Sequence, residues 1–361
     1  MPDPLLSVTA LRKQYGDLVA VDSLSFEVER GEFFTLLGPS GCGKSTTLMS
    51  LVGFEAIDGG RIELDGRDVT SVPPEGRGMG VVFQNYALFP HMNVLENVMF
   101  PLRMRGASAE RAEERARATL ELVQLDQYSA RPSEISGGQM QRVVLARALV
   151  FDPPILLMDE PLAALDRRLR QTMQFELRRI QDQVGTTVIY VTHDQEEALV
   201  LSDRIAVMRA GRFEQVAPPR EIYEQPVNAF VANFLGESNR LRVRVVSADD
   251  AGALVESVAD PSYRMHVSTA PPAFQAGTLI VRPEHVHVEW HSREPAAPSV
   301  PGIVVDRAFL GSGTRLELRL LEETWTAMVP ASVDEDALPE IGQQVNLAWS
   351  PGDARLVDAE P

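Results

Sequence analysis

The sequence is poor in cysteine and has no long apolar run. Cys42 is the single cysteine among 361 residues, which excludes an internal disulfide and suits a reducing cytoplasm. No segment approaches the roughly 18 apolar residues of a membrane-spanning helix. Met1–Thr9 also lacks the basic and then apolar layout of a signal peptide. We therefore expect a chain that stays on the cytoplasmic side of the membrane and does not cross it.

Positive charge is scarce as well. Lys and Arg number 34 against 51 Asp and Glu, which gives a net charge of −17, and the acidic excess is spread over the whole chain. An evenly acidic surface does not attract nucleic acid or anionic lipid over a long range. We therefore expect no nucleic-acid partner, and we expect any membrane association to go through a protein partner.

The length and the patterning predict two domains. A chain of 361 residues corresponds to two domains on a prior of about 150 residues each. Up to residue 235 apolar strands alternate with helical segments, whereas from Gly236 onward short strands are separated by Gly, Pro and acidic turns, as in small β-barrels. We expect an α/β domain over residues 5–235 and a smaller all-β domain over residues 236–361, with Glu294–Pro301 connecting two groups of strands.

Residues 33–48 carry the clearest motif. The apolar run Phe33–Leu37 predicts a buried strand, and a glycine-rich turn follows before a helix that begins at Lys44. This is the pattern G-x-x-x-x-G-K-[ST], in which backbone N–H groups and a helix N-terminus hold phosphate. Lys44 can reach the β- and γ-phosphates and Ser45 the magnesium ion. A chance match is the alternative, and the flanking strand and helix weigh against it.

Two residues near this loop carry further expectations. Tyr15 lies at a turn between half-buried strands in residues 5–30, and it is either an aromatic that stacks on a nucleotide base or a surface tyrosine. Cys42 lies at a helix N-terminus beside Lys44, an environment that lowers a thiol's pKa. We expect alkylation of Cys42 to inhibit the protein and bound nucleotide to protect it.

Two other apolar strands end in polar groups. Ile155–Met158 runs into Asp159-Glu160, and Val188–Thr192 runs into His193-Asp194. The helical pattern between them provides the crossover that a parallel pair requires. Because parallel strands end at one edge of a sheet, the phosphate loop, the carboxylates and the histidine could converge there. A core histidine is the alternative for His193.

Three further segments are notable. Two of them have two possible interpretations, and the third has no assigned function. Gly80–Phe83 predicts a strand that ends at Gln84, and the aromatic stretch after it is either a buried loop or a docking surface, which we favour. Its residues are Tyr86, Leu88, Phe89, His91 and Met92. Ser108 can cap a helix that runs to Val123, without an assigned function. Another helix is predicted to begin at Ser136-Gly137-Gly138-Gln139. Its N-terminus is either a second anion-binding site or an ordinary helix cap.

The ordered set of motifs resembles the ATPase subunit of ABC transporters over residues 5 to about 235. In that family the motifs are called Walker A, Q-loop, signature, Walker B, D-loop and H-loop, here Gly38–Ser45, Gln84, Ser136–Gln139, Asp159-Glu160, Ala163–Asp166 and His193. The resemblance implies an α/β P-loop NTPase fold with a helical subdomain at about residues 86–150. It also implies ATP and Mg²⁺ as cofactors, and a head-to-tail homodimer with ATP between the Walker A of one copy and the signature of the other.

The resemblance further implies a role for each motif residue. Tyr15 would stack on adenine, and the phosphates would be cradled by Gly38, Pro39, Ser40, Gly41, Cys42, Gly43, Lys44, Ser45 and Thr46. Ser45, Gln84 and Asp159 would serve the magnesium ion, Asp159 through water. Glu160 would polarise the attacking water, and His193 would contact the γ-phosphate. The opposite subunit would close the site with the signature and with the D-loop, which ends at Asp166 and has Ala163 where serine is usual.

The C-terminal segment resembles the regulatory, TOBE-like domain of importer ATPases, including the turn Val281–Glu284. Asn233–Asn239 is most similar to the polyamine (spermidine/putrescine) branch, with ferric-iron, sugar and sulfate-type importers as alternatives. The leading interpretation is the energy-coupling ATPase of an importer at the cytoplasmic face of the membrane. Two permease subunits and an external binding protein would then be separate chains. The Tyr86–Met92 stretch would bind the permease subunits.

Two other classes of function are disfavoured. A non-transport ABC ATPase, such as a DNA-repair or translation factor, needs a long coiled coil or two ATPase halves in one chain, and neither pattern is present. The acidic charge argues against a nucleic-acid factor as well. A module that binds ATP without turnover would not need Glu160 at the end of its strand.

Overall fold

The computed structural model of the chain describes residues 4–250, 252–268, 274–290 and 299–358. The chain forms two compact units, Met1–Arg220 and Glu221–Pro361, and helix α8 (Pro219–Glu224) spans the boundary between them. Within the described ranges, no helix has both the length and the apolar character needed to cross a membrane.

A six-stranded sheet forms the centre of the N-terminal unit. Its strands, in spatial order, are β10 (Arg212–Ala217), β9 (Arg204–Arg209), β3 (Phe33–Leu37), β8 (Thr187–Thr192), β7 (Ile155–Asp159) and β6 (Gly80–Val82). All neighbours pair in parallel except β10, which is antiparallel to β9. Every residue of β3 and of β8 is buried, which explains their continuous apolar runs. The three predicted central strands are therefore confirmed.

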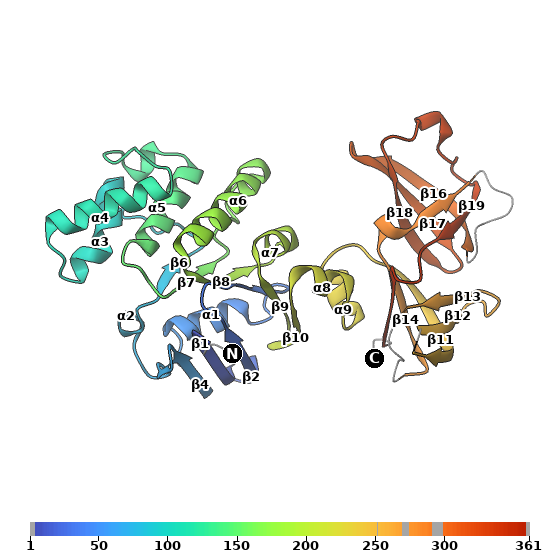
Figure 1. Ribbon diagram of the computed structural model, residues 1–361, viewed down its shortest axis with the longest axis horizontal. Coiled ribbons are helices and arrows are strands. Elements are labelled where there is room, and N and C mark those ends of the chain that lie inside the picture. The colour runs from blue at the N-terminus through green and yellow to red at the C-terminus, as the bar shows by residue number, and fades with distance from the viewer. Residues whose placement is uncertain (1–3, 251, 269–273, 291–298, 359–361) are drawn as a thin grey trace. The chain divides into compact units, whose positions relative to one another are not determined.

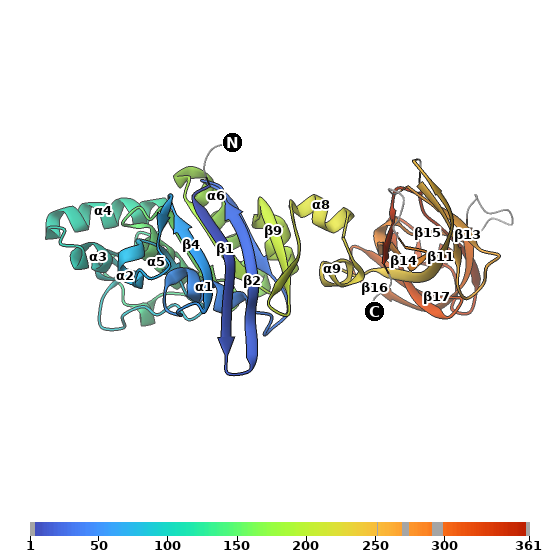
Figure 2. The same cartoon turned by 90° about the horizontal axis from the view of Figure 1, so that it is seen from below.

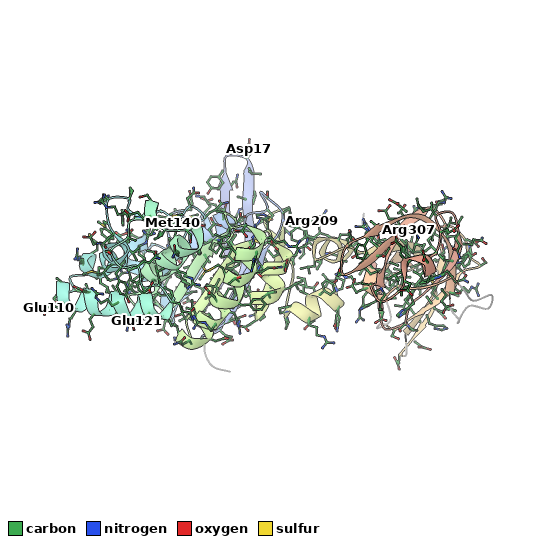
Figure 3. The ribbon with its side chains drawn as sticks, turned by 90° about the horizontal axis from the view of Figure 1, so that it is seen from above. Asp17, Glu110, Glu121, Met140, Arg209 and Arg307 are labelled. Carbon is green, nitrogen blue, oxygen red and sulfur yellow. The ribbon has the colours of Figure 1, made fainter. Side chains whose placement is uncertain are left out.

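A smaller antiparallel sheet lies beside the parallel one. It consists of β2 (Leu18–Val28), β1 (Leu6–Tyr15), β4 (Gly59–Leu64) and β5 (Arg67–Asp68). Figure 2 shows β1 and β2 side by side as a long ribbon, and Figure 3 places Asp17 at its tip. The alternating apolar side chains of these strands share one core with helix α1 (Lys44–Val52), as expected for half-buried strands.

Helices gather along the opposite face of the parallel sheet (Figure 1). The short α2 (Pro74–Arg77) is not among them, because its Arg77 donates to Ser50 O and Leu51 O of α1. The helices of this face are α3 (Val94–Met104), α4 (Ala109–Leu122), α5 (Gly137–Leu149) and α6 (Arg167–Val184), with the shorter η1 (Pro132–Glu134) and α7 (Gln195–Leu201). Their apolar side chains share a core with Phe33, Val82 and Tyr190 of the sheet. Ser108 caps α4, as predicted, and α6 is the predicted crossover between β7 and β8.

The C-terminal unit consists of two antiparallel sheets of five strands each. One sheet has the order β13 (Arg264–Val267), β12 (Gly252–Ser257), β11 (Asn239–Asp249), β14 (Ala276–Val281) and β20 (Ala354–Asp358). The other has the order β15 (His287–Glu289), β19 (Gln344–Ala348), β16 (Ser299–Phe309), β17 (Gly313–Leu320) and β18 (Glu323–Pro330). Both contribute to one core, in which the rings of Trp325 and Trp349 lie 5.1 Å apart. The all-β prediction is confirmed.

The segment before β11 packs on the C-terminal unit. Helix α9 (Ala229–Phe234) places Ala229 and Ala232 in a small core with Ile280 and Val357. The compact units therefore divide at residue 220, whereas the change in sequence pattern comes at residue 236. Of the predicted connection Glu294–Pro301, residues 294–298 lie outside the described residues, and its last three residues already belong to β16, where Val300 is buried opposite Leu347.

The expectation of a reactive Cys42 is wrong. The side chain is only 4% exposed and belongs to the core shared by the two sheets and α1. Burial raises the pKa of its thiol, because the thiolate would lose its hydration, and the nearby ammonium of Lys44, whose Nζ lies 4.0 Å from Sγ, does not offset this loss. The sequence pattern identified the cation but not the burial.

We therefore predict that Cys42 reacts slowly in the native chain. Reaction requires local opening of the core, so the rate of modification by Ellman's reagent should be about a hundredfold or more below that of the chain unfolded in guanidinium. The absorbance of the released thiolate measures both rates. A native rate close to that of free cysteine would contradict the burial of this side chain.

Candidate nucleotide-binding site

The loop between β3 and α1 is bent in a way that requires glycine at two positions. Gly43 has a φ of 107°, and a Cβ atom there would lie 2.3 Å from Ala20 O. A Cβ atom at Gly38 would lie 2.5 Å from Met208 O. Gly43 is also the N-cap of α1 and has no side chain to cap the helix, and an uncapped helix N-terminus is suited to bind an anion. This is the geometry of a phosphate cradle.

A pocket of about 670 Å³ opens above this loop. The predicted residues that line it are Tyr15, Ser40, Gly41, Gly43, Lys44, Ser45, Thr46 and Glu160. Ala20, Ala210 and Gly211 line it as well and were not predicted. Gly211 belongs to the turn between β9 and β10, and its N–H donates to Cys42 O at 2.9 Å. Part of the pocket wall therefore comes from segments that are distant in sequence from the loop.

The chain has two lysines, Lys13 and Lys44, and Lys44 lines this pocket. Lys44 is 5% exposed, and its Nζ donates to Gly38 O at 2.7 Å and to Pro39 O at 3.0 Å, which holds the cation over the loop. Nζ of Lys13 lies 4.9 Å from the centre of the Tyr15 ring. Tyr15 is 44% exposed and forms part of the pocket wall.

Asp159 and Ser45 form an oxygen-rich corner beside the loop. Ser45 Oγ donates to Asp159 Oδ1 at 3.2 Å. Burial raises the pKa of the Asp159 carboxyl and the Glu160 charge raises it further, while the Ser45 hydroxyl and the Lys44 cation lower it. Carboxylate and hydroxyl oxygens are the ligands that Mg²⁺ prefers, so this donor set fits the predicted metal. Gln84 follows β6, the neighbour of β7, and lies exposed at the same edge of the sheet.

Glu160 and His193 are in contact. His193 Nδ1 lies 3.0 Å from Glu160 Oε1, although 33 residues separate them in sequence. Glu160 has a φ of 44°, and its N–H donates to Val191 O at 2.9 Å, which turns the side chain at the strand end toward the β8 edge. The side chain of His193 is 57% exposed. The predicted convergence of loop, carboxylates and histidine is confirmed, and a core histidine is excluded.

The signature and D-loop residues act as helix caps within this chain. Ser136 caps α5, with Gln139 N donating to its Oγ at 3.4 Å and its own N–H donating to Gln139 Oε1 at 2.8 Å. Asp166 caps α6 by accepting from Leu169 N at 3.0 Å. Among the described residues that line the pocket, none comes from Ser136–Gln139. Among the described residues, the two helix starts that were predicted to bind anions therefore do not line one pocket within a single copy of the chain.

The stretch Tyr86–Met92 is anchored from beneath. The buried Asn97 amide accepts from Phe89 N at 2.8 Å and donates to Phe89 O and Met92 O, both at 3.2 Å. Arg147 of α5 donates to Ala87 O at 2.8 Å and to Tyr86 O at 3.2 Å. Tyr86, Leu88, Phe89 and Met92 are half-buried and His91 is exposed. The structure therefore combines the two interpretations: an ordered loop whose outer atoms face solvent.

Sequence reasoning missed the groups behind His193. Arg170, Asp194 and Glu197 surround the turn that carries the histidine. Asp194 is the residue next to His193, and Arg170 follows Asp166 by about one helical turn, so both were close to predicted motifs. No signal in the sequence indicates that these two segments meet in space.

Known proteins match both the N-terminal and the C-terminal parts of this chain. The model of the family described as "ABC transporter" matches residues 21–163, and that of the TOBE domain matches residues 279–357. The spermidine/putrescine import ATP-binding protein PotA of Acidothermus cellulolyticus is 46% identical over 93% of this chain and 88% of its own length. PotA of Pasteurella multocida is 42% identical over 97% and 95%. PotA of Thermotoga maritima is 37% identical over 98% of both chains.

Solved structures match the ATPase part of the chain. The dimeric structure of MJ0796, described as a bacterial ABC transporter cassette, is 31% identical with a TM-score of 0.54, over 60% of this chain and 99% of its own. A second dimeric MJ0796 structure, in a post-hydrolysis state with ADP and Pi, has a TM-score of 0.53. CbiO1 from Clostridium perfringens is 29% identical with a TM-score of 0.57, over 61% and 90%. The chain therefore belongs to the family of ABC transporter ATP-binding subunits that carry a C-terminal TOBE domain.

Proposed function

We propose that this chain hydrolyses ATP to drive a multi-subunit importer for polyamines such as spermidine and putrescine. The contact between Glu160 and His193 beside the phosphate loop carries the assignment of hydrolysis. The polyamine substrate is supported by the PotA relatives, whose likeness extends through the C-terminal unit to nearly the whole chain. Importers of ferric iron, sugars or sulfate-type anions are the alternatives.

Each group at the sheet edge then has a role in phosphoryl transfer. The backbone of residues 38–46 and the ammonium of Lys44 hold the phosphates, and Tyr15 stacks on adenine. Glu160 orients and polarises the attacking water, and His193 lies against Glu160, where it can contact the γ-phosphate. These roles fit a reaction in which positioning and charge neutralisation supply most of the catalysis.

The magnesium ion belongs with Ser45 and Asp159. The ion, when bound, neutralises charge on the phosphates. Ser45 can offer its hydroxyl oxygen directly, and Asp159, at the end of β7, can hold a water molecule of the ion's shell. Gln84 lies at the start of the anchored Tyr86–Met92 loop, so it can report both the metal and a partner that presses on that loop.

A homodimer completes the site. In one copy, Ser136–Gln139 lie outside the pocket wall, so Ser136 and Gly138 with their neighbours serve the γ-phosphate of the opposite copy. The MJ0796 cassettes, which are similar to the ATPase part of this chain, are dimers and support this arrangement. Asp166 shapes the D-loop at the same interface by capping α6.

The remaining partners are membrane permeases and an external binding protein. We assign permease docking to the outer atoms of Tyr86, Leu88, Phe89, His91 and Met92, which places the chain at the cytoplasmic face of the cell membrane. Residues 5–235 form the ATPase domain in this proposal, with a helical subdomain at about residues 86–150. Residues 236–361 form the regulatory domain.

Uptake measurements test the substrate. A strain that lacks this chain should lose most of its uptake of labelled putrescine and spermidine and should recover it when the chain is restored. Uptake of ferric iron and of maltose in the same strain should be unchanged. Loss of iron or maltose uptake with normal polyamine uptake would replace polyamines by one of the alternatives.

We predict that Glu160→Gln keeps ATP binding and lowers kcat by about a hundredfold or more. The amide fills the same space but cannot accept a proton from water, a contribution of about 10²–10⁴ in rate. Gel filtration with ATP should then show a trapped dimer. Glu121→Gln, on the exposed outer face of α4 (Figure 3), is the matched control and should hydrolyse ATP normally. Near-normal turnover in Glu160→Gln would exclude this role.

We predict that Asp159→Asn raises the melting temperature of the nucleotide-free chain while abolishing magnesium-dependent hydrolysis. Because the pKa of Asp159 is raised in the folded chain, its ionised form costs stability at pH 7, and this cost fades as the pH falls through the folded pKa. The gain in melting temperature should therefore shrink toward acid pH. Calorimetry at pH 7 and at pH 4 measures it, and a lower melting temperature for the variant at pH 7 would contradict the assignment.

A further inference from the structure

A buried carboxylate lies behind the turn that carries His193. Glu197 of α7 is 2% exposed, and its Oε2 accepts from Tyr190 OH and from Thr192 Oγ1, both at 2.8 Å. Thr192 Oγ1 also accepts from Asp194 N at 3.0 Å. The residues on both sides of His193 are therefore fixed by one hydrogen-bonded network that does not include His193 itself.

Arg170 connects this network to a second loop. Its Nη1 donates to Asp194 Oδ2 at 3.0 Å, and its Nη2 donates to Leu165 O at 3.1 Å. Its Nε lies 3.8 Å from Glu197 Oε1. A guanidinium is a planar fork of five donors, so a single side chain bridges the two loops in a fixed geometry.

The second loop is the connection that begins at Glu160. Ala163 N donates to Glu160 O at 3.2 Å, and Leu165 N donates to Leu162 O at 3.1 Å, so successive turns link Glu160 to Leu165. Arg170 holds the far end of this connection, and the contact between Glu160 and His193 closes the other end. The two catalytic side chains therefore belong to loops that are tied together behind the site.

We propose that Arg170 is a positioning residue that holds His193 against Glu160, with Asp194 as its partner on the histidine turn. This inference rests on the proposed function, because it assigns Arg170 to the hydrolysis step. Arg170 is not among the described residues that line the pocket, so it acts through the two loops and not on the nucleotide. Its loss should slow hydrolysis without weakening ATP binding.

Asp194→Asn is the mildest probe of this tie. Asp194 Oδ1 caps α7 by accepting from Glu196 N at 2.9 Å, and asparagine caps helices about as well as aspartate. The variant therefore keeps the helix start and loses only the carboxylate oxygen that accepts from Arg170. We expect kcat of the full-length chain to fall by about tenfold, since small misplacements of catalytic groups cost factors of this order or more, with KM for ATP unchanged.

Arg170→Met should give the same loss, and the double variant should be no slower than the slower single one, because both changes break one tie. Arg178→Met is the matched control: it lies on the same helix and also joins a backbone carbonyl, Leu201 O, to a carboxylate, Asp203 Oδ1, each at 3.0 Å. Its ion pairs lie away from both loops. It should lose stability comparably and keep its kcat.

A spectroscopic measurement separates positioning from general destabilisation. The imidazole Cε1–H resonance of His193, assigned by its absence in His193→Ala, should shift in Arg170→Met and in Asp194→Asn but not in Arg178→Met. If Arg170→Met fails to fold, the Asp194→Asn kinetics and resonance decide alone.

The outcomes separate the two proposals. Absence of ATP hydrolysis in both the unmodified chain and Arg178→Met would overturn the proposed function. The positioning role alone would be overturned by a different result. In it, the unmodified chain hydrolyses ATP, and Asp194→Asn shows a normal kcat and an unshifted His193 resonance. An equal loss of kcat in Arg178→Met, or additive losses in the double variant, would overturn it as well.

Discussion

The order of three parallel strands is the constraint on which the rest of the site depends. Strands β3, β8 and β7 are neighbours in the sheet, so the phosphate loop, the histidine and the carboxylates emerge at one edge. That order requires strands buried on both faces, with the helices of one core covering one face and α1 and the antiparallel sheet covering the other. A slip of one strand would separate Glu160 from His193 and Asp159 from Ser45.

Buried arginines that bind backbone carbonyls hold the loops in both units. Arg77 donates to Ser50 O at 2.9 Å and to Leu51 O at 2.6 Å at the end of α1. Arg282 of the C-terminal unit donates to Ala232 O at 2.8 Å and to Gly236 O at 3.2 Å. Burial lowers the pKa of both guanidinium groups. The carbonyl oxygens compensate the guanidinium groups for their lost hydration. One arginine side chain therefore holds several backbone groups of a loop in place.

Local pattern predicted those features that depend on neighbouring residues in the chain. The continuous apolar runs indicated the parallel strands, and the glycine-rich turn before Lys44 indicated the phosphate cradle, because both are determined within a few residues. The prediction of a lowered thiol pKa for Cys42 was wrong for the opposite reason. The proximity of Cys42 to Lys44 is local in sequence, whereas its burial comes from two sheets that meet over α1. The contact of α9 with the C-terminal unit was similarly hidden, because it depends on packing and not on composition.

The sequence by itself determined which chemical groups this protein has and the strand ends on which they lie. It determined the phosphate loop, the carboxylate pair and the histidine, because each consists of residues that are adjacent along the chain. Only the tertiary structure decided that Glu160 reaches His193, that the turn at Gly211 closes the pocket and that Arg170 ties two loops together. These contacts join residues far apart in sequence, and their formation depends on the pairing order of the strands and the burial that follows from it.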